Sequence, residues 1–155
     1  MTALSRQTLL RRTGAILAVL MVATPLAACS DEGKLVLHSS TGDYPFNIEV
    51  VDTPESRAKG LMFVQDLADD AGMLFDFKQE QNVSFWMQNT FIPLDMLFIR
   101  ADGTVARIAE RTEPLSTRTI PSGEPILSVL EINGGVSKQL GIKPGDKVEH
   151  ALFKR

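Results

Sequence analysis

The stretch over residues 72–95 constrains the fold more than any other part of the chain. Two apolar runs, 73–77 and 83–87, flank a polar turn, and both are short and rich in aromatic or β-branched residues. Runs of that length between polar turns are typical of strands, so we expect the two to pair as a hairpin. Pro93 lacks a backbone donor and should interrupt pairing before the next run. The stretch therefore predicts the central strands of a β domain, followed by a loop over 89–95 at its rim.

The first 28 residues have the order of a secretory signal. Three arginines (Arg6, Arg11 and Arg12) precede an uncharged apolar core over residues 14–23. A core of that length is typical of a signal peptide and is too short to span a membrane as a helix. The general and the twin-arginine export routes both stay open, although the residues around the arginine pair fit the twin-arginine pattern poorly. We expect an exported protein from which residues 1–28 are removed.

The signal ends at Leu26-Ala27-Ala28-Cys29, which resembles the lipobox of bacterial lipoproteins. The only cysteine of the chain stands at the position that a lipobox requires. The resemblance implies cleavage before Cys29 and acylation of the new N-terminus, and several acyl chains hold a protein on a membrane in practice permanently. Ser30 follows where Asp retains some lipoproteins in the inner membrane, so we expect the outer membrane, with the protein facing the periplasm. The alternative is an ordinary secretory cut beside a stray cysteine.

The mature chain has the size of one domain. Residues 29–34 form a short tether with the lipidated cysteine at its start, and residues 35–155 form the domain itself. Three arginines and no acid leave with the signal, which leaves 13 basic and 19 acidic residues and a net charge of −6. Such a charge disfavours nucleic acid as a partner. A lone cysteine forms no disulfide within the chain, so stability must come from the apolar core.

The remaining runs predict further strands and two short helices. Thr53 before Pro54 is typical of a helix start, with Ser56 where a capping box prefers Glu. A second short helix is expected over 136–140. Strands are expected over 35–37, 46–50, 94–99, 104–109, 126–132 and 147–153, with an ordered loop over 110–125, and the run 94–99 is apolar enough for burial on both faces. The predicted fold is all-β, a single-domain β-sandwich or jelly-roll-like barrel.

Several blocks of the sequence occur in an order that resembles one protein family. The blocks are Arg57 with Gly60-Leu61-Met62, Gly72-Met73-Leu74-Phe75, Phe85-Trp86-Met87-Gln88-Asn89-Thr90, Ile92-Pro93-Leu94-Asp95, Leu130-Glu131-Ile132-Asn133-Gly134-Gly135 and residues 141–146. They resemble domain of unknown function 192 over nearly the whole mature chain. Two positions depart from the family pattern, since Gln88 stands where Lys is usual and Val64 where Arg is frequent. The resemblance implies a small β-rich domain, often exported, and transfers no catalytic residue.

Two acids embedded in apolar sequence are the candidate catalytic residues. Asp95 and Glu131 would perform acid–base chemistry if the fold paired them, which gives a hydrolase or carbohydrate-active enzyme as one hypothesis. The alternative is that each carboxylate accepts hydrogen bonds from loop amides and fixes a turn. Nothing in the sequence brings the two acids together, so the structural role is favoured.

Metal binding is the second chemistry considered. Met62, Met73 and Met87 would offer thioethers to Cu(I), although Met also fills irregular cores and strand alternation places Met87 with core side chains. His38 and His150 lie in separate terminal segments without the spacing of zinc ligands. The sequence therefore predicts no cofactor and keeps copper handling as an alternative.

The remaining candidate is a ligand groove beside the loop over 89–95. Trp86 points away from the face of Met87 and would be part of a second core or the floor of a groove. Asn89, Thr90 and Asp95 can close the loop and leave amide and hydroxyl groups for a small polar or sugar-like ligand. The leading hypothesis is a lipid-anchored, non-catalytic binding or accessory module of the cell envelope. Its predicted ligand-binding residues are Trp86, Asn89, Thr90 and Asp95.

Overall fold

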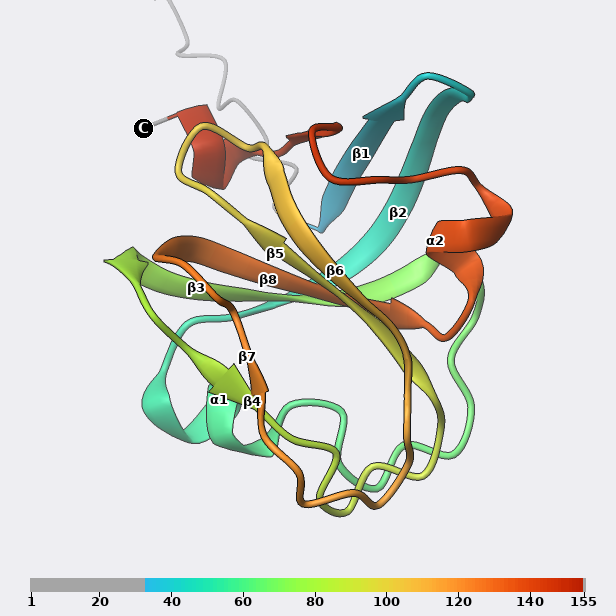
Figure 1. Ribbon diagram of the computed structural model, residues 1–155, viewed down its shortest axis with the longest axis vertical. Coiled ribbons are helices and arrows are strands. Elements are labelled where there is room, and N and C mark those ends of the chain that lie inside the picture. The colour runs from blue at the N-terminus through green and yellow to red at the C-terminus, as the bar shows by residue number, and fades with distance from the viewer. Residues whose placement is uncertain (1–32, 155) are drawn as a thin grey trace, which may run out of the picture.

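The computed structural model describes residues 33–154, which form nine strands and three short helices (Figure 1). The strands are β1 (Lys34–Ser39), β2 (Gly42–Val51), β3 (Ala71–Gln81), β4 (Ser84–Phe85), β5 (Leu94–Ile99), β6 (Val105–Thr112), β7 (Ile120–Pro121), β8 (Ile126–Asn133) and β9 (Lys147–Glu149). The helices are α1 (Pro54–Lys59), α2 (Val136–Gln139) and the 3₁₀ helix η1 (Ala151–Lys154). The predicted all-β class is confirmed. Within this range no helix has the length and apolar character needed to cross a membrane, and the predicted signal and Cys29 lie outside it.

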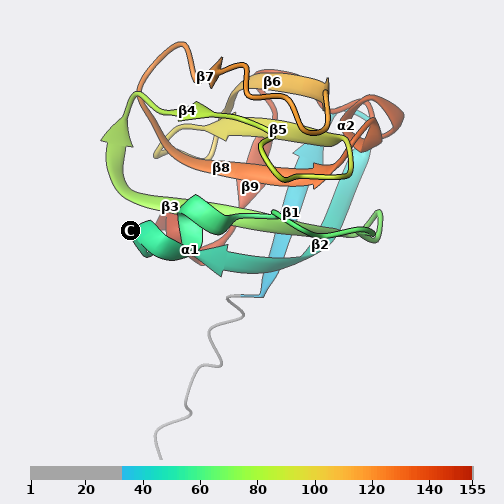
Figure 2. The same ribbon diagram turned by 90° about the horizontal axis from the view of Figure 1, so that it is seen from below.

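Seven strands form one curled sheet in the order β6-β5-β8-β3-β2-β1-β9. Its two edges meet near the start of β6, where the Val105 amide donates to the Asp146 carbonyl at 2.9 Å. The Val148 amide donates to the Gly103 carbonyl at 2.8 Å beside it. These bonds close one end of the curl, and the sheet becomes a half-barrel (Figure 2). The short strands β4 and β7 pair with each other in a separate two-stranded sheet.

One neighbouring pair of strands, β2 and β3, is parallel, with Val51 opposite Phe75. Parallel neighbours need a crossover connection, and α1 lies within it. The Thr53 hydroxyl accepts from the Ser56 amide at 3.1 Å, and the Ser56 hydroxyl accepts from the Thr53 amide at 3.1 Å. Serine thus completes the capping box that usually contains Glu. Gly60 ends the helix with a φ of 47°, a conformation that glycine adopts without strain.

The predicted hairpin between residues 73–77 and 83–87 is wrong. β3 pairs with β2 and β8, whereas β4 pairs with β7. Both edges of β3 are therefore occupied, and residues 83–87 cannot pair with it; residues 84 and 85 pair with β7 instead. Lys78 takes a φ of 65° at the register shift between Asp76 and Gln81, and the chain then leaves the sheet for a second layer.

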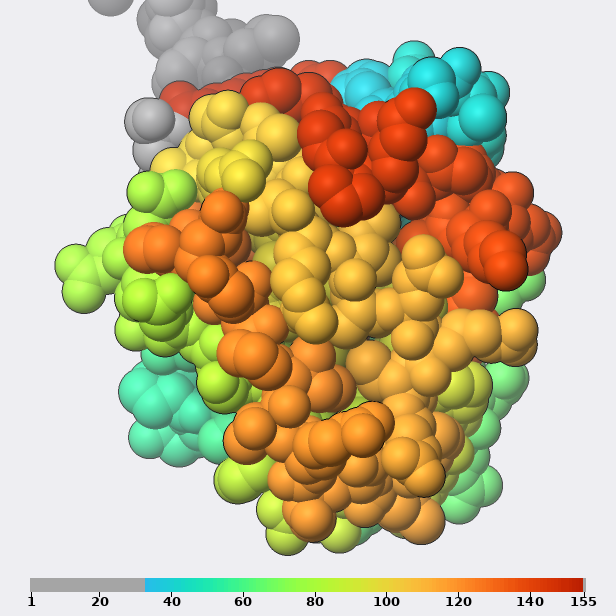
Figure 3. All heavy atoms as spheres, in the orientation of Figure 1, coloured from blue at the N-terminus to red at the C-terminus, as the bar shows by residue number. Residues whose placement is uncertain are grey.

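The curled sheet separates two apolar cores, because successive side chains of a strand point to opposite faces. On β3, Leu74 joins the core inside the curl, whereas Met73 and Phe75 join an outer core. All six side chains of β5 are buried, as the nearly continuous apolar run over 94–99 predicted. Ile120 of β7 packs against the outer core, and the orange segment around β7 covers the lower part of this face in Figure 3. The outer core is the layer in which the candidate site lies.

The C-terminal part of the chain also differs from the prediction. A strand was expected over 147–153, but β9 ends at Glu149 and η1 follows. Nδ1 of His150 accepts from the Leu152 amide at 3.1 Å, and this local bond replaces strand pairing. Residues 110–125, predicted to be one long loop, contain two strand segments. β6 extends to Thr112, and β7 lies at residues 120–121.

Candidate ligand-binding site

A groove opens beside the outer core, between α1 and the segment that contains β4. Its volume is about 370 Å³, within the range of small-molecule sites. Its walls come from α1 and the loop after it, from β3, from residues 83–86 and from β8. The lining side chains include Arg57, Met62, Phe77, Trp86, Thr90 and Glu131.

The aromatic wall of the groove is fixed by edge-to-face contacts around Phe85. The centre of the Phe85 ring lies 5.1 Å from Phe75, 6.2 Å from Phe77 and 6.2 Å from Phe98. Edge-to-face pairs stabilise a fold by roughly 0.5–1.5 kcal/mol each beyond the area they bury. This cluster holds β4 against β3 and β5 and so sets the position of the β4 wall.

Trp86 lies at the mouth of the groove. The residue is 51% exposed, whereas the next residue, Met87, is fully buried in the outer core. The two side chains point in different directions, as expected, although residues 86 and 87 lie just beyond β4. A half-exposed indole that also lines the groove is accessible to a ligand, so Trp86 is not a member of a second sealed core.

Glu131 reaches the groove from β8. It stands opposite Met73 of β3 and Met96 of β5, and so shares the outer face with apolar neighbours. The residue is only 4% exposed, and within residues 33–154 its carboxyl has no hydrogen-bonding or ionic partner. Burial raises the pKa of this carboxyl to about 8. At neutral pH Glu131 is therefore a neutral carboxylic acid, which can donate one hydrogen bond and accept others.

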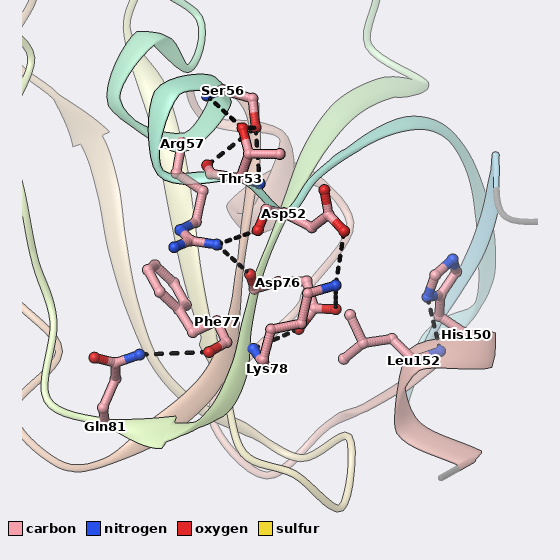
Figure 4. Close-up of polar contacts among 10 residues, drawn as sticks. All are labelled: Asp52, Thr53, Ser56, Arg57, Asp76, Phe77, Lys78, Gln81, His150 and Leu152. Carbon is pink, nitrogen blue, oxygen red and sulfur yellow. Dashed lines mark hydrogen bonds and ion pairs between the residues drawn. The ribbon is translucent and has the colours of Figure 1, made fainter.

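Arg57 brings a positive charge to the groove. Its Nη1 donates to the carbonyl oxygen of Asp76 at 2.9 Å and to that of Asp52, and its guanidinium carbon lies 5.2 Å from the centre of the Phe77 ring. Both acceptors are backbone carbonyls, so these bonds fix the side chain without pairing its charge. Figure 4 shows the other two guanidinium nitrogens pointing away from the two carbonyls.

Three loops meet at the end of the groove where Thr90 lies. The Phe63 amide donates to the Asn89 carbonyl at 2.9 Å, and the Leu115 amide donates to the Thr90 carbonyl at 3.0 Å. Asn89 has a φ of 58°, a conformation that Asn tolerates better than most residues. Its side-chain amide donates to the sulfur of Met62 at 3.9 Å. Thr90 lines the groove, whereas Asn89 holds the loop in place.

Asp95 lies on the other face of the sheet from Glu131. In the β5–β8 ladder Asp95 stands opposite Ile132, whereas Glu131 stands opposite Met96, so the two carboxyl groups point to opposite faces. The expected rim of Asn89, Thr90 and Asp95 is therefore not a single structure. The pairing that the hydrolase hypothesis requires is absent too, because the register of β5 separates the two acids.

The carboxylate of Asp95 has a structural role instead. It is completely buried and accepts hydrogen bonds from the amides of Arg111, Gly135 and Ser137 and from the Ser137 hydroxyl, at 2.7, 2.9, 2.9 and 2.5 Å. These bonds tie β5 to the end of β6 and to the start of α2. The role matches the alternative in which a carboxylate accepts from loop amides and fixes a turn.

Two of the three methionines proposed as copper ligands, Met73 and Met87, belong to the packing of the outer core. Met73 and Met87 are 5% and 0% exposed, and the Thr112 hydroxyl donates to the sulfur of Met87 at 3.1 Å. Met62 lines the groove apart from them. In the described part of the chain no group of three or more His, Cys, Asp or Glu side chains could hold a metal ion.

The sequence placed Trp86 and Thr90 in one predicted ligand site and Glu131 among the catalytic candidates, and it joined neither to Arg57. Glu131 was recognisable as a candidate functional residue because it is an acid within an otherwise apolar predicted strand. Arg57 was harder to recognise, since basic residues are common in short exposed helices. The parallel crossover from β2 through α1 to β3 brings the helix to the mouth of the groove, and its pairing is not visible in local sequence.

Two solved structures resemble this chain along most of its length. A protein from Sinorhizobium meliloti 1021, provisionally labelled a transcription regulator, is 43% identical. The alignment covers 77% of this chain and 93% of that one, with a TM-score of 0.75. A protein of unknown function from Novosphingobium aromaticivorans DSM 12444 is also 43% identical, over 75% of this chain and 83% of that one, with a TM-score of 0.73. No curated protein gives a match.

The sequence pattern of one family covers nearly all of the half-barrel and the whole of the groove. This is domain of unknown function 192, described as "Uncharacterized ACR", and it matches residues 36–150. The match includes every residue that lines the groove, among them Arg57, Trp86 and Glu131, and extends over more than half of the sequence. The chain belongs to the domain of unknown function 192 family.

Proposed function

We propose that this protein is a non-catalytic module of the bacterial cell envelope that binds a small molecule in the groove between α1 and β4. The observation that carries the proposal is the carboxyl of Glu131, which lines the groove that Trp86 flanks and has no hydrogen-bonding or ionic partner among residues 33–154. Cys29 would hold the module at the membrane through its lipid.

The Glu131 carboxyl opens onto the groove, so a ligand that excludes water from the groove must supply it with a hydrogen-bonding partner. Burying a polar group without a hydrogen bond costs roughly 1–3 kcal/mol in proteins. Most buried polar side chains therefore have partners, and the exceptions call for a functional or chemical explanation. Because Glu131 lines the groove, a hydroxyl or amide of a ligand can supply the partner that the protein does not.

The surrounding side chains favour a small ring with polar groups at its edge, such as a sugar. Trp86 presents a half-exposed indole on which the apolar face of a ring can stack. Thr90 and the neutral Glu131 add groups that both donate and accept hydrogen bonds. A largely apolar groove with a few polar groups is the common form of a small-molecule site.

Other functions have less support from the geometry. A glycoside hydrolase needs two carboxyl groups that flank one bond, and Asp95 faces away from Glu131. A role in transcription, which is the label of the Sinorhizobium meliloti protein, would favour a positively charged surface for nucleic acid. Residues 29–155 carry 13 basic and 19 acidic residues instead.

Ligand binding is tested by NMR, because Trp86 is the only tryptophan of the chain and gives a single indole resonance. A panel of small sugars and hydroxylated rings should include compounds that shift this resonance. Saturation-transfer experiments on the same compounds should show that Trp86→Ala loses binding at an unchanged melting temperature. Phe63→Ala is the matched control, since Phe63 is an aromatic residue that is 61% exposed and lies outside the groove lining. Binding that survives Trp86→Ala, or a panel without a binder, contradicts the proposal.

A further inference from the structure

The groove is positively charged although the protein as a whole is acidic. The chain has a formal net charge of −3. Arg57 and Lys59 line the groove from α1, and Glu131 is the one acid among its lining residues. Because the Glu131 carboxyl is neutral at pH 7, it does not offset these charges. The lining therefore carries a positive charge next to an apolar, aromatic wall.

Arg57 is held in a way that leaves it available to an anion. Its Nη1 is bound by the carbonyls of Asp52 and Asp76, and its guanidinium rests against the ring of Phe77. The nitrogens that point away from these carbonyls (Figure 4) have no hydrogen-bond acceptor among residues 33–154. A guanidinium binds the two oxygens of a carboxylate through parallel hydrogen bonds, and one that is already immobilised loses less entropy on binding.

Glu131 fits the same kind of ligand. In its neutral form it can donate a hydrogen bond to an oxygen of an anionic ligand, whereas an ionised carboxylate in a groove of this size would repel one. A basic residue and a neutral acid thus favour the same sign of ligand charge. Trp86 adds a surface for a ring with an apolar face.

We infer that the groove binds a carboxylate carried on a ring with an apolar face, with Arg57 on the carboxylate and Trp86 on the ring. The inference rests on the proposed ligand site and adds the charge and the class of the ligand. Two kinds of molecule share this chemistry, namely sugar acids and alicyclic carboxylic acids.

Two matched pairs of probes test the inference: D-glucuronate against D-glucose, and cyclohexanecarboxylate against cyclohexanecarboxamide. Each is titrated into the full chain in non-ionic detergent at pH 7, with calorimetry and the fluorescence of Trp86 as readouts. In at least one pair the acid should bind tenfold or more tightly than its neutral partner. Which pair responds separates sugar acids from alicyclic acids. Arg57→Gln should reduce the preference to less than twofold, and Arg57→Lys should retain part of it. Arg118→Gln, which removes an exposed arginine outside the groove lining, should leave it unchanged.

The results separate the inference from the proposed function. If a neutral probe binds as tightly as its acid and Trp86→Ala abolishes binding, the groove is a ligand site and the inference about charge is wrong. If no probe binds, or if an acid preference survives Arg57→Gln, the inference is also wrong. If Arg57→Gln fails to fold, the inference is still tested by two measurements: the acid preference of the wild-type protein and the change in that preference in Arg57→Lys.

Discussion

Replacing Glu131 by Gln should make the protein more stable at neutral pH. The substitution keeps the shape of the side chain and its hydrogen-bonding capacity but removes its ability to ionise. In the folded protein, burial raises the pKa of the Glu131 carboxyl from 4.5 to about 8. In the unfolded chain the carboxyl regains its ordinary pKa, so it is ionised at pH 7 in the unfolded state and protonated in the folded state. The wild-type protein therefore takes up a proton on folding, and the variant does not.

The sign and size of the effect follow from this proton. Between pH 4.5 and 8 the unfolded state binds fewer protons at this site than the folded state, so the wild-type free energy of unfolding falls as the pH rises. Each pKa unit corresponds to about 1.4 kcal/mol. At pH 7 the shift from 4.5 to about 8 acts over roughly 2.5 units, which gives a penalty of about 3 kcal/mol. Glu131→Gln should recover most of that penalty at pH 7, less at pH 5, and little more above pH 8.

Urea denaturation at pH 5, 6, 7 and 8 measures the effect, with the fluorescence of Trp86 as the signal. Both proteins carry Cys29→Ser, which should prevent the proposed acylation. The gain in unfolding free energy of Glu131→Gln over the wild type should rise by about 2–3 kcal/mol between pH 5 and pH 7. Glu110→Gln, in which an exposed glutamate changes, is the matched control. A gain that is the same at every pH would contradict the prediction, because it would mean that the pKa of Glu131 is not raised in the folded protein.

Three further predictions concern the fold and the anchor. Asp95→Asn should lower the free energy of unfolding by roughly 3 kcal/mol. The carboxylate accepts hydrogen bonds from buried groups, including the amide and hydroxyl of Ser137, and the variant removes this charged acceptor. Gly103→Ala should lower thermal stability, since Gly103 has a φ of 77° and a Cβ would lie 2.7 Å from a carbonyl oxygen, whereas Gly33→Ala should have little effect because its nearest atom would be 3.7 Å away. The protein should incorporate labelled fatty acid, and Cys29→Ser should abolish incorporation; mass spectrometry that finds another mature N-terminus would contradict the anchor.

Local features of the sequence predicted local structure well. The nearly continuous apolar run over 94–99 forms β5, which is buried on both faces. Thr53 and Pro54 marked the start of α1, where the capping bonds depend on neighbouring residues alone. These features depend on residues that are neighbours in the chain, so the local sequence is sufficient to predict them.

The partners of the strands were not predictable in the same way. The runs 73–77 and 83–87 look like a hairpin because they are adjacent and apolar, but β3 pairs with β2 and β8. Both arrangements bury the same side chains of residues 73–77. The choice between them depends on contacts with segments far away in the chain, which periodicity does not report.

The candidate site shows the same division. Asp95 and Glu131 had the same signal, an acid inside an apolar strand, but the register of β5 against β8 gives them opposite faces and different roles. The Asp95 carboxylate accepts a hydrogen bond from an amide of α2, whereas the Glu131 side chain lines the groove. A change of register by one residue would exchange the faces, and the sequence alone does not specify register. Trp86 was predictable as a groove residue only to the extent that it alternates with the buried Met87.

A crystal structure of the protein soaked with the tightest-binding carboxylate tests the central claim most directly, namely that the groove beside Glu131 is a ligand site. We expect density for the ligand between α1 and β4, with its ring against Trp86, its carboxylate at Arg57 and a hydrogen bond from Glu131. The same soak of Trp86→Ala crystals should leave the groove without ligand density. Ligand bound elsewhere in the wild-type protein, or bound in the groove without contact to Trp86 and Glu131, would contradict the account.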